Sequence, residues 1–156
     1  MASSTPHRPE KPIPEISDAM RPFFEAARAH RLVIQRCRQC GTCRFPARQL
    51  CSRCLGGEAD WVPASGRGVV FSFGVVHQVY HPAFAAEVPY AVVVIELEEG
   101  VRMTANLLDC PLDAVRIDLP VEVCFEERTP EVSLPQFRPL RARVDGEVRT
   151  EPQRGR

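Results

Sequence analysis

Two pairs of cysteines, each spaced by two residues, most limit how this chain folds. They lie in CRQCGTCRFPARQLCSRC, residues 37–54, where ten residues separate one pair from the other. Ten residues are enough for a strand, a turn and a returning strand, which brings four thiolates to one tetrahedral centre. The sequence therefore predicts one metal site, with the ligands Cys37, Cys40, Cys51 and Cys54.

A fifth cysteine in this segment, Cys43, offers a second pairing with Cys40. Gly41 follows Cys40, where the turn needs a residue that tolerates positive φ, whereas Arg44 follows Cys43. We therefore interpret Cys43 as a free thiol on the outgoing strand. The odd total of seven cysteines and an N-terminus without a secretory signal argue against disulfides and place the chain in the reducing cytoplasm.

Four cysteine ligands close the coordination shell of a zinc ion and leave no position for water or substrate. The predicted site therefore favours structural Zn²⁺ over a catalytic metal. Two alternatives stay open from the residues alone, because the same cysteines can hold a rubredoxin-like iron or form a redox disulfide.

Charge is distributed unevenly, although the formal net charge is zero. Residues 26–57 carry seven arginines and no acid, whereas residues 68–129 carry ten acids and three bases. Some arginines would offset the negative thiolate site, and others would be free to bind phosphate or acidic groups of a partner. The candidates for contact with a phosphate-bearing ligand or a partner anion are Arg36, Arg44 and Arg48.

Periodicity and composition predict a mainly β fold, in which an N-terminal helix and a zinc ribbon precede a small OB-fold barrel. Four alternating apolar runs without intervening helices support the barrel, and in the first of them Val69, Phe71, Phe73 and Val75 should share one face. The predicted segments are a flexible arm at 1–16, a helix at 17–33, the ribbon at 34–64, the barrel at 65–140 and a disordered tail at 141–156.

His77 and His81 are the remaining candidates for chemistry. Two histidines four residues apart are compatible with a metal site or a general base, but no carboxylate is paired with them in the sequence. A histidine at a strand end that makes one hydrogen bond is the favoured interpretation. The chain also lacks a glycine-rich phosphate loop, so we predict no catalytic residue.

The order of motifs resembles one family over about residues 20–140. This is the acyl-CoA-associated OB-fold family with an N-terminal rubredoxin-like zinc ribbon, known as domain-of-unknown-function family thirty-five. A glycine usual before the Pro-Val step is absent from Ile117–Pro120, and Cys43 is not in the family's ligand set. The resemblance is carried by FFEAARAHRLVIQRCRQCGTCRFPARQLCSRC (23–54), Trp61, SGRGVVFSF (65–73), PYAVVVIELEEGVRMTANLLD (89–109), PVEVCFE (120–126) and PQFRPL (135–140).

The resemblance implies a non-catalytic subunit of a heteromeric complex that acts on a thioester of coenzyme A (CoA). It makes CoA the phosphate-bearing ligand expected at Arg36, Arg44 and Arg48. The expected partner is a thiolase-like enzyme, either a lipid-transfer-type thiolase or an aldolase. The two proteins are expected to form a heterotetramer that does not associate with a membrane. A hot-dog-type enoyl-CoA hydratase is the alternative partner. Phe23 and Phe24 are the expected apolar anchors of the partner interface.

Three other functions fit parts of the sequence less well. Zinc ribbons and OB-folds both bind nucleic acids, but an acidic barrel opposes a phosphate backbone, so no nucleic acid is expected. A small redox carrier would require iron, which gives a coloured protein. A stand-alone enzyme that uses His77 or His81 has the least support.

Overall fold

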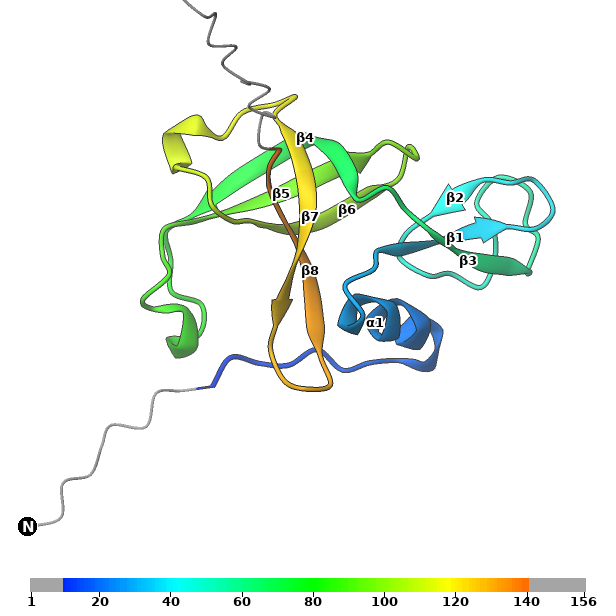
Figure 1. Cartoon of the computed structure of the whole chain (residues 1–156), viewed down its shortest axis with the longest axis horizontal. Coiled ribbons are helices and arrows are strands. Elements are labelled where there is room, and N and C mark those ends of the chain that lie inside the picture. Colours follow the sequence, from blue (N-terminus) through cyan, green and yellow to red (C-terminus); the bar gives the residue numbers. More distant parts are fainter. Residues whose placement is uncertain (1–9, 141–156) are drawn as a thin grey trace, which may run out of the picture.

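The computed structural model describes residues 10–140, which form a helix, a three-stranded ribbon and a closed five-stranded barrel in chain order (Figure 1). The predicted tail at 141–156 and the first nine residues of the predicted arm lie outside the described residues. Within 10–140, no helix has the length and apolar character needed to cross a membrane.

The N-terminal helix is shorter than the segment predicted for it. A 3₁₀ turn, η1 (Asp18–Met20), leads into α1 (Arg21–Arg28), with Pro22 in the first turn, where its missing N–H costs no hydrogen bond. The helix then ends in a Schellman motif. His30 takes φ 54°, and the N–H groups of His30 and Arg31 donate to the carbonyls of Ala27 and Ala26.

The ribbon is a small antiparallel sheet in the order β2-β1-β3. β1 (Val33–Cys37) lies at its centre and pairs with β2 (Cys43–Arg44) on one side and β3 (Ala59–Pro63) on the other. β1 therefore begins next to the end of α1 and ends at Cys37, the first of the four predicted metal ligands.

The barrel confirms the predicted OB-fold class, because its five strands close in the order β4-β5-β6-β8-β7. β6 and β8 pair in parallel, and the other neighbours are antiparallel. The strands are β4 (Arg67–Val76), β5 (Tyr90–Leu97), β6 (Arg102–Leu107), β7 (Pro120–Glu127) and β8 (Ser133–Pro139). Short 3₁₀ turns interrupt two connections, η2 (Pro82–Phe84) and η3 (Leu112–Ala114).

One hydrophobic core joins the helix, the ribbon and the barrel. Phe23 of α1 and Ile34 of β1 belong to the same buried cluster as Phe137 and other barrel residues. The Phe23 ring centroid lies 4.9 Å from that of Phe45 and 6.5 Å from that of Trp61. Because aromatic side chains bury large areas, this contact packs α1 against the ribbon, and the shared cluster joins both to the barrel.

The predicted single face for the alternating residues of β4 is wrong. A β-bulge interrupts the pairing with β5 between Val70 and Ser72. Val70 is buried opposite Ile95, while Val69 lies opposite Glu96 and Phe73 opposite the buried Val93. An extra residue in one strand reverses the alternation beyond it, so Val69 and Phe73 point to opposite faces.

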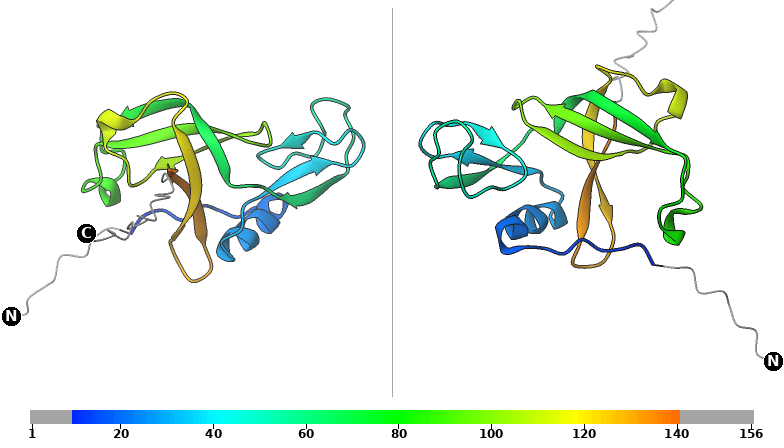
Figure 2. Two further views of the ribbon diagram at one scale, coloured as in Figure 1. Left: turned by 45° about the horizontal axis from the view of Figure 1, so that its top comes forward. Right: turned by 180° about the vertical axis from the view of Figure 1, so that it is seen from behind.

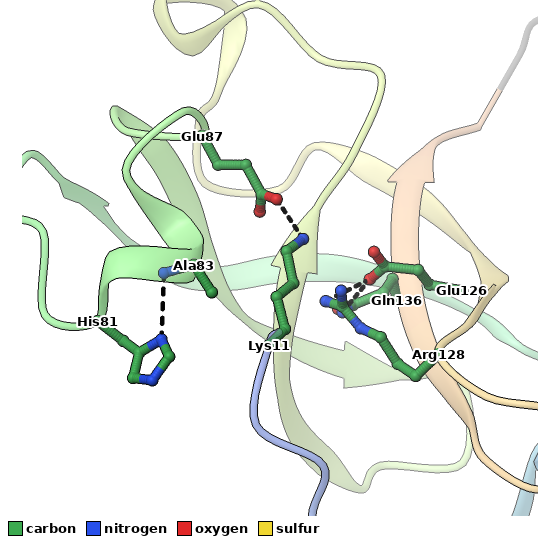
Figure 3. Close-up of polar contacts among 7 residues, drawn as sticks. All are labelled: Lys11, His81, Ala83, Glu87, Glu126, Arg128 and Gln136. Atoms are coloured by element: carbon green, nitrogen blue, oxygen red, sulfur yellow. Dashed lines mark hydrogen bonds and ion pairs between the residues drawn. The ribbon is translucent and has the colours of Figure 1, made fainter. Parts of the chain in front are cut away.

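The described part of the arm lies against the barrel and is held by Lys11. Its ammonium group forms an ion pair with Glu87 (Figure 3). It also lies 5.3 Å from the centroid of the Phe84 ring. In the same view Arg128 pairs with Glu126 at 3.0 Å. The arm therefore crosses between the connection β4–β5 and the connection β7–β8.

The turn before β7 shows how the chain manages without the glycine usual in the family. Asp118 takes φ 60°, and its N–H donates to the carbonyl of Val70 at 2.9 Å. Aspartate is among the few residues that tolerate this left-handed conformation.

We expect Asp118→Gly to leave the free energy of unfolding unchanged or to raise it by up to about 1 kcal/mol, because glycine relieves the left-handed strain at some entropic cost. Asp118→Val should lower it by about 1–2 kcal/mol, because a β-branched side chain is disfavoured there. Urea unfolding of both variants measures this. Equal effects of glycine and valine would contradict it.

Candidate metal centre

The two cysteine pairs sit in two turns of the same construction. In the first turn the N–H of Gly41 donates to the carbonyl of Cys37, and in the second the N–H of Leu55 donates to that of Cys51, both at 2.9 Å. Gly41 and Leu55 have φ 72° and 59°. The first positive φ was predicted from Gly41. The second was not, because leucine gives no sign of it.

These turns bring the four predicted ligand sulfurs together. All four Sγ atoms lie within 4.8 Å of one another, and the pairs Cys37–Cys54 and Cys40–Cys51 are each 3.6 Å apart. A tetrahedral zinc ion with Zn–S bonds of about 2.3 Å requires sulfurs about 3.8 Å apart. The spacing therefore fits a single tetrahedral ion.

Hydrogen bonds and burial act differently on the four thiols. The hydroxyl and backbone of Thr42 lower the pKa of Cys40 to about 6. Backbone N–H groups of Arg53 and Cys54 lower the pKa of Cys51. At Cys54 the N–H of Gly56 acts in the same direction, but burial and neighbouring sulfurs outweigh it and raise its pKa to about 12. Metal binding would remove the remaining protons.

The four clustered donor atoms are all sulfur, and four such ligands suffice for tetrahedral zinc. Cys37 and Cys51 are buried, while Cys40 and Cys54 are half-buried. Such a set can hold an ion and cross-link two turns, and it leaves no coordination position for a substrate. Cys43 lies on β2, opposite Arg36 of β1, and is not among the four clustered cysteines.

Arg44 has an internal role in this structure. It is 9% exposed, its Nε donates to Gln35 Oε1 at 2.8 Å, and its Nη2 donates to the carbonyl of Arg48 at 2.9 Å. Its Nη1 is buried without a partner among residues 10–140. Arg44 therefore holds the loop before Cys51 in place, and its predicted contact with an outside anion gains no support from this geometry.

The other two predicted anion contacts, Arg36 and Arg48, are exposed. Arg38, which is not among the predicted anion contacts, donates from Nε and Nη2 to Asp60 Oδ1 at 2.8 and 2.7 Å. Its hydrogen bond lowers the pKa of Asp60. Arg38 is thus neutralised by β3, while the guanidinium groups of Arg36 and Arg48 face solvent.

The two predicted interface anchors have different environments. Phe23 is only 4% exposed and belongs to the shared core, so it is not a surface anchor in this structure. Phe24 is half-buried and lines a groove of about 550 Å³ between the arm, α1 and the barrel. Phe23 shares the buried face of α1 with Ala26 and Ala27, which follow it at the i+3 and i+4 spacing of one helical face.

Neither histidine gains a catalytic partner from the structure. His81 Nδ1 accepts a hydrogen bond from the N–H of Ala83 at 3.2 Å and caps η2 (Figure 3). His77 is exposed at the end of β4. Among the described residues, the cysteine cluster is the only group of three or more possible metal ligands brought together.

A zinc ribbon followed by an OB-fold barrel is thus the class of protein that the fold and the site define. Models of two domains match in the same order: the ChsH2 rubredoxin-like zinc ribbon domain over residues 24–60 and the ChsH2 C-terminal OB-fold domain over residues 61–126. The chain belongs to this ChsH2-type family, also called DUF35, which confirms the resemblance seen in the sequence.

Individual relatives agree with this assignment. The chain is 43% identical over 129 residues to a probable enoyl-CoA hydratase alpha subunit of Thermomonospora curvata, covering 83% of this chain and 40% of that protein. It is 31% identical over 126 residues to the benzoylsuccinyl-CoA thiolase subunit BbsA of Thauera aromatica, covering 79% of this chain and 85% of that one. The chain therefore spans less than half the length of the hydratase subunit it matches.

A solved structure, entitled Ltp2-ChsH2(DUF35) aldolase, contains a chain of the same fold. The match has a TM-score of 0.74 and 43% identity, and it covers 81% of this chain and 98% of that chain. Nearly the whole of that solved chain therefore corresponds to about four fifths of this chain.

We expect the purified protein to contain about one zinc ion per chain, as measured by metal analysis. Cys37→Ser should abolish zinc retention and lower the thermal midpoint, because a structural site contributes its binding energy to folding. Cys43→Ser is the matched control and should retain zinc. Zinc loss in the control, or full retention in Cys37→Ser, would contradict the assignment of ligands.

Arg44→Ala should lower the free energy of unfolding by about 2 kcal/mol, because it removes packing and leaves buried polar partners unsatisfied. Arg36→Ala, at an exposed position, should change it by no more than about 0.5 kcal/mol. Denaturant unfolding at constant zinc compares the two. Similar effects of both substitutions would refute the internal role of Arg44.

Proposed function

We propose that the chain is a non-catalytic subunit of a heteromeric acyl-CoA-processing complex, and that the catalytic residues lie on a thiolase-like or aldolase-like partner. The observation that carries the proposal is the match along the ribbon and barrel to the chain of the Ltp2-ChsH2(DUF35) aldolase. The closed four-cysteine site supports a structural role, because it offers no position for a reacting group.

In this proposal, Zn²⁺ is the metal of the four-cysteine site. Bound zinc would cross-link the two turns and keep β1 in register with β3. The residues that would hold it are Cys37, Cys40, Cys51 and Cys54, whose Sγ atoms already lie close together. Zinc takes no part in the chemistry of the complex.

The CoA thioester is the shared substrate of the proposed complex. Its phosphates carry negative charge, and the exposed guanidinium groups of Arg36 and Arg48 suit them. Arg44 would act indirectly, since it binds the backbone carbonyl of Arg48 and so positions that loop. The proposed assembly is a heterotetramer of two such chains and two enzyme subunits.

A hydratase of the hot-dog type is the second candidate partner. It is favoured by one observation, the 43% identity to a probable enoyl-CoA hydratase alpha subunit. The match covers 40% of that longer protein, so the likeness resides in one part of it. The thiolase-like partner is preferred because the matched chain of the Ltp2-ChsH2(DUF35) aldolase structure corresponds to this fold over nearly its whole length.

Binding of nucleic acid is disfavoured by the electrostatics of the barrel. OB-folds bind single-stranded nucleic acid on a barrel face between two connections, with basic side chains and exposed aromatic rings. In this chain the two connections are β4–β5 and β7–β8. Here the arm crosses that region, and Lys11 and Arg128 are paired with Glu87 and Glu126. A phosphate backbone would meet excess acid.

We expect tagged full-length chain, expressed with the thiolase-like protein of its gene neighbourhood, to co-purify with that protein in equal amounts. The partner alone should lose most of its C–C bond-forming or bond-cleaving activity on an acyl-CoA and regain it when the chain is added. Light scattering of the purified complex measures its stoichiometry.

The zinc-free variant Cys37→Ser gives a control for assembly in this experiment, since a misfolded ribbon should also fail to activate the partner. A partner that is fully active and stable without the chain would refute the proposal. Salt-dependent binding of single-stranded DNA or RNA would favour the nucleic-acid function instead.

A further inference from the structure

β4 is paired along both edges only in its first half. Arg67–Val69 pair with β7, and the N–H of Val70 donates to the carbonyl of Leu119. Ser72–Val76 pair with β5 on one side, but no residue among 10–140 forms a backbone hydrogen bond along their other side. Unpaired N–H and C=O groups along a strand edge are a template for another strand.

Apolar side chains are exposed along the same stretch. Phe73 is 40% exposed, Val79 44% and Tyr80 76%. Phe71 is 44% exposed, and the Arg102 guanidinium covers its ring at 3.3 Å from the centroid. We call residues 72–80 the free edge, which comprises the half of β4 that is unpaired on one side and the start of the connection that follows it. In the view from behind, the strands of this part of the barrel are not covered by α1 or the ribbon (Figure 2).

The free edge also lacks the charges that protect most exposed strands. No Asp, Glu, Lys or Arg occurs from Gly68 to Ala86. Natural edge strands are usually blunted by charged side chains, lysine above all, by proline or by a covering segment. An uncharged, apolar edge of this kind is an aggregation hazard unless another surface covers it in the working assembly.

Gly74, in the middle of the free edge, is not required by the fold of the chain itself. A Cβ at this position would meet no heavy atom within 4 Å, and its φ is not in the left-handed range. Glycine weakens a strand relative to alanine, and it often marks a place where another backbone approaches closely. No contact among residues 10–140 therefore accounts for glycine at this position.

We propose that the free edge binds an extended, uncharged strand of the thiolase-like partner, which adds to the barrel sheet beside Ser72–Val76. This inference rests on the proposed function. An edge of free peptide groups matches another backbone, and the absence of charge requires an uncharged segment opposite it. The adjoining surface of the partner covers Val79 and Tyr80.

A second copy of the chain is a poorer occupant. Five strand residues at about 3.4 Å each give about 17 Å of paired edge, whereas a stable interface buries about 800 Å² on each partner. A larger protein that also covers the connection after β4 reaches that area more readily.

The test is Gly74→Lys in the full-length chain, with the thiolase-like protein that co-purifies with the wild type. The added side chain has space in the free chain, so its thermal midpoint should not change. On the sheet face its charged side chain would lie beside the uncharged side chains of an added strand, so affinity for the partner should fall at least tenfold. Glu98→Lys is the control and should bind the partner like the wild type. Glu98 follows the end of β5 that pairs with Gly68, so it lies near the start of β4, away from the free edge.

Hydrogen exchange of the complex gives a second readout, in which amides of Ser72–Val76 should become protected. Equal affinity of Gly74→Lys and wild type would overturn the inference while leaving the proposed function intact. A wild-type chain that dimerises alone, and a Gly74→Lys chain that does not, would assign the edge to a second copy and also overturn it. A wild-type chain that binds no thiolase-like protein would remove both proposals.

Discussion

The packing of β1 between the cysteine cluster and the aromatic core is the constraint on which the rest of this structure depends. Cys37 ends the strand at the metal site, and Ile34, three residues earlier, is fully buried in the common core with Phe23. One strand therefore couples the geometry of four sulfur atoms to the position of α1. A ribbon with so few strands has little core of its own, so it needs both attachments.

This arrangement explains why the part of the chain richest in reactive side chains is structural. The four cysteines lie together in the candidate metal site. Arg38 pairs with Asp60, and Arg44 donates to Gln35 and to the backbone carbonyl of Arg48. Each of these residues looks chemically able in isolation. Their partners, all within the ribbon, convert that ability into the stiffness of a small sheet.

The sequence was sufficient for features that depend on local spacing. The cysteine spacing predicted the cluster, and alternation predicted a closed β-barrel, because both patterns repeat over a few residues. It was insufficient where the outcome depends on distant partners. The bulge after Val70 reversed the faces of β4, and Leu55 has a positive φ that leucine rarely adopts. The paired arginines likewise could be separated from the free ones only when β3 and the loop before Cys51 were in place.

Lys11, which fastens the arm to the barrel, is the only lysine in the chain. Apart from the terminal amine, it is therefore the only primary amine available for acylation or reductive methylation. Isotope-labelled methyl groups attached there by reductive methylation keep the positive charge, so they would lie near Glu87 and the Phe84 ring, without any engineered cysteine. The chain thus carries a built-in spectroscopic reporter, placed where arm and barrel meet, whose signal changes if the arm lifts from the barrel.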